Sequence, residues 1–283
     1  MKKVILSADS TCDLGPILKE RYNVEFFPFT ITLDDKTYLD NVDITADAIY
    51  DTFRDHGALP KTSAINVMEY VDYFKKFVDE GYEVVHLNLG SGLSSTHNNC
   101  RMAAAEVGNV YPVDSCNLST GIGLLVIEAA ERIASGMEAK QVAEEVQALT
   151  SNVHTNFVLD TLDYLKAGGR CSALAALGAN ILGIKPCIEV DNTCGKMGVG
   201  KKYRGKFDKV LEQYATERID LYDNLKTDRV FITHSGISEE RIQIIKDIVE
   251  ASGKFDEIFV TRASCTISSH CGPNTIGILF MTK

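Results

Sequence analysis

Residues 83–115 read "EVVHLNLGSGLSSTHNNCRMAAAEVGNVYPVDS", and this stretch decides the fold class. Its first part, "EVVHLNLG" (83–90), is a short apolar run that is typical of a buried strand. The segment "STHNNCRMAAAEVG" (95–108) is rich in helix formers and stops at a glycine, and "NVYPVDS" (109–115) again resembles a strand. A strand, a helix and a second strand in this order predict a crossover unit with two parallel strands.

The residues around this unit continue the alternation of strands and helices. Thr45 is placed to cap one helix that Gly57 stops, and Asn66 with Glu69 forms a capping box for the next. Asp34–Asp35 is a turn signal within extended chain. The pattern therefore predicts a strand at 2–8, helices at 14–23, 45–57, 66–81 and twice within 118–150, extended chain at 25–40, and a loop at 58–65.

The second half of the chain follows a less regular pattern. It predicts a strand at 154–160, a helix at 161–169, a buried apolar helix at 172–184, a hairpin at 185–205, a long helix at about 206–222, a strand-helix-strand unit over 228–264, and a last strand at 275–281. We therefore expect an α/β protein with two closely packed domains. They are an N-terminal parallel-sheet α/β domain (1–152) and a C-terminal α+β domain (153–283).

Composition and charge exclude several classes of protein. The 283 residues are 45% apolar and 24% charged, with a formal net charge of -10, which argues against nucleic-acid binding. The apolar stretch before Asp9 is too short for a signal peptide, and no apolar run is long enough to span a bilayer. Eight cysteines without C-x-x-C spacing indicate buried thiols in a reducing compartment. We expect a soluble cytoplasmic protein without stable membrane insertion.

The sequence does not support a phosphate-binding loop or a metal site. "GKMGVGKK" (195–202) approaches a phosphate-binding loop, but Lys202 stands where Ser or Thr should hold Mg²⁺, and a hairpin return rather than a helix follows. A solvated basic turn is the better interpretation. The six histidines show no paired spacing, so we expect no metal site.

Hydroxyl groups gather at the start of two predicted helices. Ser94, Ser95 and Thr96 follow the strand at 83–90 and open the next predicted helix. Their hydroxyls and the free N–H groups there could bind an anion, or the turn could present a serine nucleophile, or the hydroxyls could only cap the helix. Thr62 and Ser63 precede another helix. Two such loops in an alternating α/β pattern indicate that they converge at one sheet edge.

Two basic side chains lie beside turns in the second half. Arg170 follows a glycine pair, where an arginine usually pairs with a carboxylate or a carbonyl. His270 precedes Gly272–Pro273 and an apolar strand, a setting in which a lone histidine is more often structural than functional.

Six blocks carry a family resemblance. They are "DSTCDL" (9–14), "KTSAIN" (61–66), "GSGLSSTHNN" (90–99), "VDS" (113–115), "LDYLKAGGRCSALAALGANILGIKPCIEV" (162–190) and "HCGPNTIG" (270–277). Together they resemble the DegV family over essentially the whole chain. The resemblance implies a bacterial lipid-binding protein of two α/β domains, with one long-chain fatty acid buried between or beneath them. It further implies a carrier without catalytic activity or cofactor, which presents the carboxylate to a separate fatty acid kinase for acyl phosphate formation and phospholipid synthesis.

The resemblance also implies a ligand site. Thr62, Ser94 and His270 match the family's carboxylate-binding positions, and Ser63, Ser95 and Arg170 match neighbours that we expect to support that site. The apolar segments "EFFPFTI" and "SALAALGANILGI" supply candidate tunnel residues. We expect the acyl chain to be lined by Phe27, Phe29, Ile31, Leu177 and Ile181.

The chain departs from the family pattern in three places. Ala64–Ile65 stand where the family usually has Gln-Pro, Ser95 replaces a glycine, and Asn274 replaces another. Asn tolerates left-handed backbone, so we expect the turn at Asn274 to survive.

Other functions remain open at this stage. A Ser/His hydrolase or acyl transferase would use Ser94 as nucleophile and His270 as base, but it lacks a third member. A DNA-associated regulator is opposed by the charge. The basic stretch of Lys201, Lys202, Arg204 and Lys206 is either a kinase-docking surface or a solvated turn.

Overall fold

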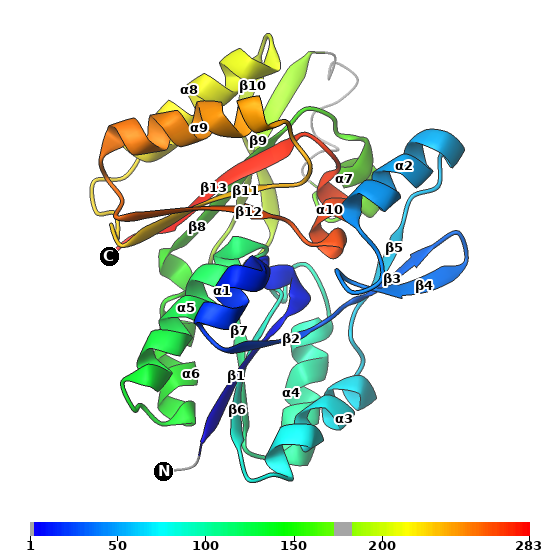
Figure 1. The fold of residues 1–283 in the computed structure, drawn as a ribbon, viewed down its shortest axis with the longest axis vertical. Coiled ribbons are helices and arrows are strands. Elements are labelled where there is room, and N and C mark those ends of the chain that lie inside the picture. Colours follow the sequence, from blue (N-terminus) through cyan, green and yellow to red (C-terminus); the bar gives the residue numbers. More distant parts are fainter. Residues whose placement is uncertain (1–2, 173–182) are drawn as a thin grey trace.

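The computed structural model describes residues 3–172 and 183–283. In Figure 1 a four-stranded sheet occupies the lower part of the molecule, and a six-stranded sheet lies above it. The lower sheet is wholly parallel, with strand order β2-β1-β6-β7. Its strands are β1 (Val4–Asp9), β2 (Val24–Phe27), β6 (Glu83–Asn88) and β7 (Val110–Asp114).

Helices cover both faces of this sheet. Helices α3 and α4 lie on one face and α5 and α6 on the other, while α1 connects β1 to β2 (Figure 1). The crossover unit predicted from residues 83–115 is confirmed, since β6 and β7 pair in parallel around α4. These helices are α1 (Gly15–Arg21), α3 (Val67–Val78), α4 (Thr96–Val107), α5 (Thr120–Ala134) and α6 (Ala139–Ala148).

The upper sheet is mixed, with strand order β10-β9-β8-β13-β11-β12. Its hairpin and its parallel strand-helix-strand unit confirm the predicted elements. The strands are β8 (Val153–Leu159), β9 (Ile184–Val190), β10 (Met197–Arg204), β11 (Arg229–His234), β12 (Glu257–Arg262) and β13 (Thr275–Met281). Its outer face is covered by α8 (Phe207–Asp220) and α9 (Glu239–Ser252) (Figure 1).

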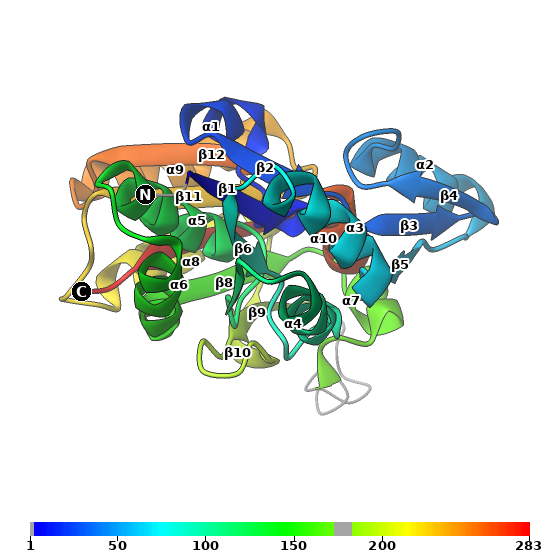
Figure 2. The same ribbon diagram turned by 90° about the horizontal axis from the view of Figure 1, so that it is seen from below.

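A small antiparallel sheet with one helix stands at the side of the molecule (Figure 2). Asp34 and Asp35 both have positive φ, at 48° and 60°, and close the β3–β4 hairpin as predicted. Thr45 and Gly57 bound the helix as expected. These elements are β3 (Thr30–Leu33), β4 (Lys36–Leu39), β5 (Lys61–Ser63) and α2 (Ala46–His56).

Two sequence expectations need correction. The segment 58–65 is not all loop, because β5 pairs with β3, placing Thr62 opposite Ile31. Residues 265–271 form a short helix, α10 (Cys265–Cys271), that the sequence did not indicate. Both elements are too short to show a periodic pattern of their own, and tertiary partners stabilise them. Helix α7 (Asp163–Gly168) and the 3-10 turns η1 (Ser10–Cys12) and η2 (Thr150–Asn152) complete the described chain.

Helix α5 joins the two halves into one packed unit. Its first ten residues are all buried, and it contacts β1 and β6 below and β8 and β13 above. One apolar core runs from Leu6 in the lower sheet to Leu279 in the upper sheet. The strands of the lower sheet end before residue 152 and those of the upper sheet begin after it, while the boundary itself stays a prediction.

Candidate ligand-binding site

A cavity of about 240 Å³ lies where β5, the β6–α4 loop and α10 meet. It takes residues from both halves of the chain, and of its described lining residues only Arg170 is permanently charged. The six head-group residues expected from the resemblance all line it. The lining consists of Phe29, Thr62, Ser63, Ala64, Leu89, Leu93, Ser94, Ser95, Leu118, Arg170, Met197, Thr266, Ile267, His270 and Cys271.

Thr62 and His270 meet at this cavity although 208 residues separate them. Thr62 is held by the pairing of β5 with β3, and His270 sits on the last turn of α10. The Thr62 hydroxyl lies 2.8 Å from His270 Nε2, a normal hydrogen-bond distance. The two side chains therefore form one polar group at an otherwise largely apolar cavity.

The imidazole of His270 is neutral at neutral pH. Burial, with a smaller contribution from Arg170, lowers the pKa of His270 from its usual 6.5 to about 4. Its Nδ1 has no hydrogen-bond partner within the described residues. When Nε2 carries the proton it donates to the Thr62 oxygen, and the Thr62 hydroxyl hydrogen is then free to donate to a ligand oxygen.

Gly168 allows His270 to lie where it does. A Cβ added at Gly168, in the last turn of α7, would stand 2.3 Å from His270 Nδ1. That separation is well inside van der Waals contact, so a larger residue would displace the ring. The glycine pair that the sequence analysis noted beside Arg170 is thus part of the wall behind His270.

The two serines of the β6–α4 loop have different surroundings. Ser94 is half-buried and its hydroxyl accepts a hydrogen bond of 3.2 Å from the Thr96 N–H. Ser95 is exposed at the N-cap position of α4 and makes no side-chain cap bond. Capping therefore accounts for one lone pair of Ser94, and its hydroxyl hydrogen remains able to donate to a ligand.

Arg170 lies exposed at the opening of the cavity. Its Nη1 donates to the Gly168 carbonyl oxygen at 2.6 Å, which directs the guanidinium along the end of α7. A second depression of about 310 Å³ shares Arg170 with the cavity and is also lined by the exposed Lys196. Cations are thus concentrated at the outer edge of the site rather than inside it.

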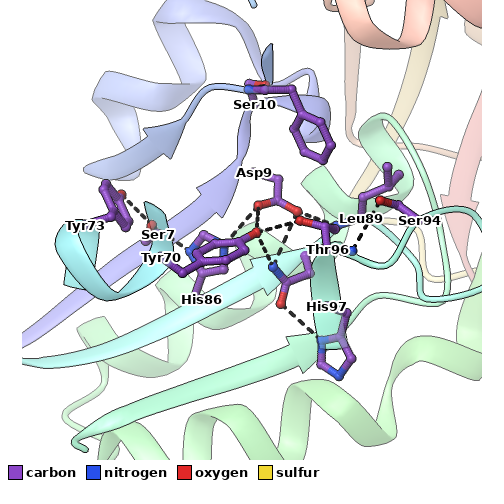
Figure 3. A network of polar contacts seen from close by, with 12 residues as sticks. Ser7, Asp9, Ser10, Tyr70, Tyr73, His86, Leu89, Ser94, Thr96 and His97 are labelled. Atoms are coloured by element: carbon purple, nitrogen blue, oxygen red, sulfur yellow. Dashed lines mark hydrogen bonds and ion pairs between the residues drawn. The ribbon is translucent and has the colours of Figure 1, made fainter. Parts of the chain in front are cut away.

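A buried polar network supports the loop that carries Ser94 (Figure 3). Asp9 and His86 are both fully buried, and His86 Nε2 lies 3.0 Å from Asp9 Oδ1. Asp9 Oδ1 also accepts from the Tyr70 hydroxyl at 2.7 Å, and Asp9 Oδ2 accepts from the Leu89 N–H at 2.8 Å. Sequence reasoning missed this network, although polar residues at the ends of neighbouring parallel strands, Asp9 and Asn88, were a usable signal.

The expected tunnel residues are only partly assembled at the cavity. Phe29 lines it, whereas Phe27 stacks on Tyr73 with ring centroids 4.2 Å apart, and Ile31 belongs to a separate core cluster around α2. The segment 25–31 is divided between two strands, because β2 ends at Phe27 and β3 begins at Thr30. Leu177 and Ile181 lie outside the described residues.

Apolar residues that the sequence did not single out form much of the wall. They include Leu89, Leu118, Met197 and Ile267. A further void of about 30 Å³ shares Leu118, Ile267 and Cys271 with the cavity and reaches Phe157 and Leu279 in the upper sheet. The apolar space therefore points inward between the two halves. Asn274, beyond this wall, has φ of 55°, so the expected left-handed turn is present.

Several alternative sites receive no support from the described residues. Residues 195–202 lie in the β9–β10 hairpin rather than before a helix. Across residues 3–172 and 183–283, no group of three or more His, Cys, Asp or Glu is arranged to hold a metal ion. In the same part of the chain, no helix is long and apolar enough to cross a membrane.

An apolar cavity between two α/β halves, with a few hydrogen-bonding groups at its opening, is the kind of site that small-ligand-binding proteins have. The chain belongs to the DegV family, since the model for "uncharacterised protein, DegV family" matches residues 3–283. The family resemblance and the two-domain α/β fold expected from the sequence are therefore confirmed.

Relatives and solved structures match over nearly the whole length. Two DegV domain-containing proteins of Clostridium perfringens are 27% and 30% identical, and each alignment covers at least 98% of both chains. A fatty-acid-binding DegV family protein from Thermus thermophilus superposes with a TM-score of 0.91 at 28% identity, covering 99% of this chain and 100% of the other. A stearic-acid-binding protein from Eubacterium ventriosum gives 0.86 at 27% identity, covering 100% and 99%.

Proposed function

We propose that this protein binds one long-chain fatty acid in the cavity between its halves. The carboxylate would be held by Thr62, Ser94 and His270. The observation that carries the proposal is the Thr62–His270 hydrogen bond at the opening of an apolar cavity, in a chain whose structural relatives bind fatty acids. Ser63, Ser95 and Arg170 stand next to these groups and would support the head group.

The chemistry of the site suits an amphipathic ligand. Burying the 15 or so CH₂ and CH₃ groups of a 16-carbon chain contributes on the order of 12 kcal/mol gross, at about 0.8 kcal/mol each. A carboxylate needs only a few donors, which the hydroxyls of Thr62 and Ser94 supply. A neutral His270 orients the Thr62 hydroxyl without forming an ion pair, so the carboxylate stays accessible to a second protein.

We infer that the protein acts as a carrier without catalytic activity or cofactor. It would present the carboxylate to a fatty acid kinase, which forms an acyl phosphate for phospholipid synthesis in the cytoplasm. Arg170 at the opening and the exposed Lys202, Arg204 and Lys206 are candidate contacts for that kinase. Lys201 is a weaker candidate because it forms an ion pair with Glu217.

The test is to denature the purified protein, extract it with organic solvent and identify the extract by mass spectrometry. One fatty acid per protein chain is the expected result. A lipid-free extract, together with failure of the protein to bind added palmitate or stearate, would contradict the proposal. Kinase coupling is tested separately, by phosphoryl transfer to the bound fatty acid in the presence of a purified fatty acid kinase.

The Ser94/His270 hydrolase interpretation has less support. His270 Nε2 is bonded to Thr62, and its Nδ1 has no carboxylate partner within the described residues. A serine nucleophile needs a base within hydrogen-bond reach that a third group orients. Hydrolysis of an ester substrate that Ser94→Ala abolishes would nevertheless establish it.

A further inference from the structure

Helix α10 carries His270, and side chains from elsewhere in the chain bind the start of this helix. Its last turn holds His270, while Thr266, Ile267 and Cys271 also line the cavity. The position of this seven-residue helix therefore sets the position of the imidazole. So short a helix has little stability of its own.

Four N–H groups at the start of α10 all have acceptors. The Ser264 N–H donates to Asp13 Oδ1 at 2.9 Å, and the Thr266 N–H donates to Asp40 Oδ1 at 3.3 Å. The Cys265 N–H donates to Asn41 Oδ1, and the Ile267 N–H to the Ser264 hydroxyl, both at 3.3 Å. Three of these acceptors come from the N-terminal half, so the helix end is docked across the two halves.

The second oxygens of the two carboxylates are also used. Asp13 Oδ2 accepts from the Ser119 hydroxyl at 2.6 Å, which ties the site to the start of α5. Asp40 Oδ2 accepts from the Ser10 hydroxyl at 2.7 Å, and the Ser10 oxygen in turn accepts from the Phe29 N–H at 3.1 Å. Phe29 lines the cavity, so the same carboxylate is connected to both α10 and the cavity wall.

Both carboxylates are costly to bury. Asp13 is 3% exposed and Asp40 is 2% exposed, and neither forms an ion pair within the described residues. Burial raises the pKa of Asp13 to about 7 and raises the pKa of Asp40 as well. Burying two carboxylates without a cation partner costs stability even when they are hydrogen-bonded, and buried groups with perturbed pKa values cluster at functional sites.

We propose that Asp13 and Asp40 are positioning residues of the carboxylate-binding site, which act through α10 to hold His270 against Thr62. This inference rests on the proposed function of the cavity. Neither carboxylate lines the cavity. Each carboxylate accepts a hydrogen bond from an N–H group at the start of α10, where a helix has no backbone acceptor of its own.

The proposal has a consequence for pH. The titratable and charged groups that face the pair are Cys12 beside Asp13, Cys265 and Cys271 on α10, and Arg262 at the end of β12, with Asp9 beyond Cys12. Burial raises the pKa of Cys265 and of Cys271 to about 12, so these thiols stay neutral near pH 7. Loss of the Asp13 proton then adds a negative charge at the start of α10, the helix that carries His270, and we expect its repulsion of the ligand carboxylate to weaken binding as pH rises through about 7.

The experiment compares an amide and an apolar replacement at each carboxylate. Asp13→Asn and Asp40→Asn keep an oxygen acceptor for the α10 N–H, whereas Asp13→Leu and Asp40→Leu remove it. Glu128→Gln is the matched control, because Glu128 is a buried carboxylate on α5 that pairs with Arg132 and Lys226, away from α10. Palmitate affinity is measured at pH 6 and pH 8, and the His270 ring is followed by ¹⁵N-histidine NMR in ligand-free protein.

We expect palmitate binding to weaken about tenfold or more in the two Leu variants, with a shift of the His270 resonance in the ligand-free protein. The Asn variants and the control should bind within about threefold of the wild type at pH 6. The wild type should bind about threefold or more weakly at pH 8 than at pH 6, and Asp13→Asn should remove most of this difference.

Folded Leu variants with wild-type affinity and an unshifted His270 resonance would overturn the proposal. If the Leu variants do not fold, an Asp13→Asn variant with an unchanged pH profile overturns it instead. If the wild type binds no palmitate, the proposed function fails. The His270 resonance of the ligand-free variants then still decides whether the carboxylates position the ring.

Discussion

The imidazole of His270 shows how its surroundings decide the role of one residue. A cationic histidine would bind a carboxylate as an ion pair, whereas a pKa of about 4 makes this ring a neutral hydrogen-bonding group. His270→Ala removes the partner of the Thr62 hydroxyl, and we expect fatty-acid binding to weaken by about 1–3 kcal/mol. Isothermal titration with palmitate checks this. His154→Ala is the control, since His154 bonds to Thr282 outside the cavity, and equal affinities of both variants would refute the assignment.

Asp13 gives a second residue-scale prediction, on stability. Burial raises the pKa of the Asp13 carboxyl from its ordinary value of 3.8 to about 7 in the folded protein. Between pH 3.8 and about pH 7 the folded state therefore binds more protons at this group than the unfolded state does. The contribution to stability is therefore full below about pH 4 and is lost as pH rises to about 7. Asp13→Asn should gain stability relative to the wild type by at least about 1 kcal/mol on going from pH 5 to pH 8.

Urea unfolding at the two pH values measures this difference. Asn tolerates the left-handed backbone at this position, where φ is 53°, so the substitution adds no backbone strain. Burial lowers the pKa values of His234 and His270 to about 4, so these two histidines reduce stability as pH falls below about 6.5. The wild type and the variant both contain them, so their effect cancels in the comparison. A stability difference that does not change with pH would show that Asp13 is ionised throughout.

At the scale of elements, contact between α7 and α10 decides how well the site is formed. Gly168→Ala places a Cβ against His270 Nδ1, so we expect the ring to shift and fatty-acid binding to weaken about tenfold. The helix itself should not suffer, because alanine favours a helix over glycine by about 0.5–1 kcal/mol. Thermal unfolding and palmitate titration together separate the two effects.

Gly198→Ala is the matched control, since its added Cβ would meet nothing nearer than the Glu189 carbonyl oxygen at 3.9 Å. Weaker binding in both glycine variants, or in neither, would contradict a specific role for Gly168.

The elements also show why the sequence predicted only some of the segments that form the site. Strands and helices with a periodic pattern were recognised, whereas β5 and α10, which carry Thr62 and His270, have too few residues to show one.

At the scale of the whole molecule, the continuous core makes the two halves one cooperative unit. Because α5 is packed between both sheets, separating the halves would expose its buried face. We predict a single calorimetric unfolding transition whose calorimetric and van't Hoff enthalpies agree. Saturating palmitate should raise the midpoint temperature of this transition, because a ligand at a hundred times its Kd stabilises the folded state by about 2.7 kcal/mol.

Two resolved transitions in the ligand-free protein would contradict this prediction. If neither palmitate nor decanol raises the midpoint temperature, the result contradicts ligand binding. It does not bear on cooperativity. Decanol serves as the control because it carries an alkyl chain without a carboxylate. The two parts of the prediction therefore fail independently.

The family and the candidate polar residues of the site came from the resemblance of six blocks spread over residues 9–277, and their role as ligand contacts stays a prediction. Residues 83–115 and the elements around them were sufficient to predict the α/β class and the crossover unit. Local patterns suffice for this, because strand and helix periodicity, caps and turn residues act over a few positions. Asn274 in its left-handed turn and the Asn66–Glu69 capping box are examples.

Only the tertiary structure decided which of these residues meet and in what state. The neutral His270, its contact with Thr62, and the carboxylates of Asp13 and Asp40 at the start of α10 depend on packing between segments more than 200 residues apart. Burial sets those pKa values, and burial is a property of the folded molecule rather than of any short segment. The same reason separates Phe29, which lines the cavity, from Phe27 and Ile31, which pack elsewhere.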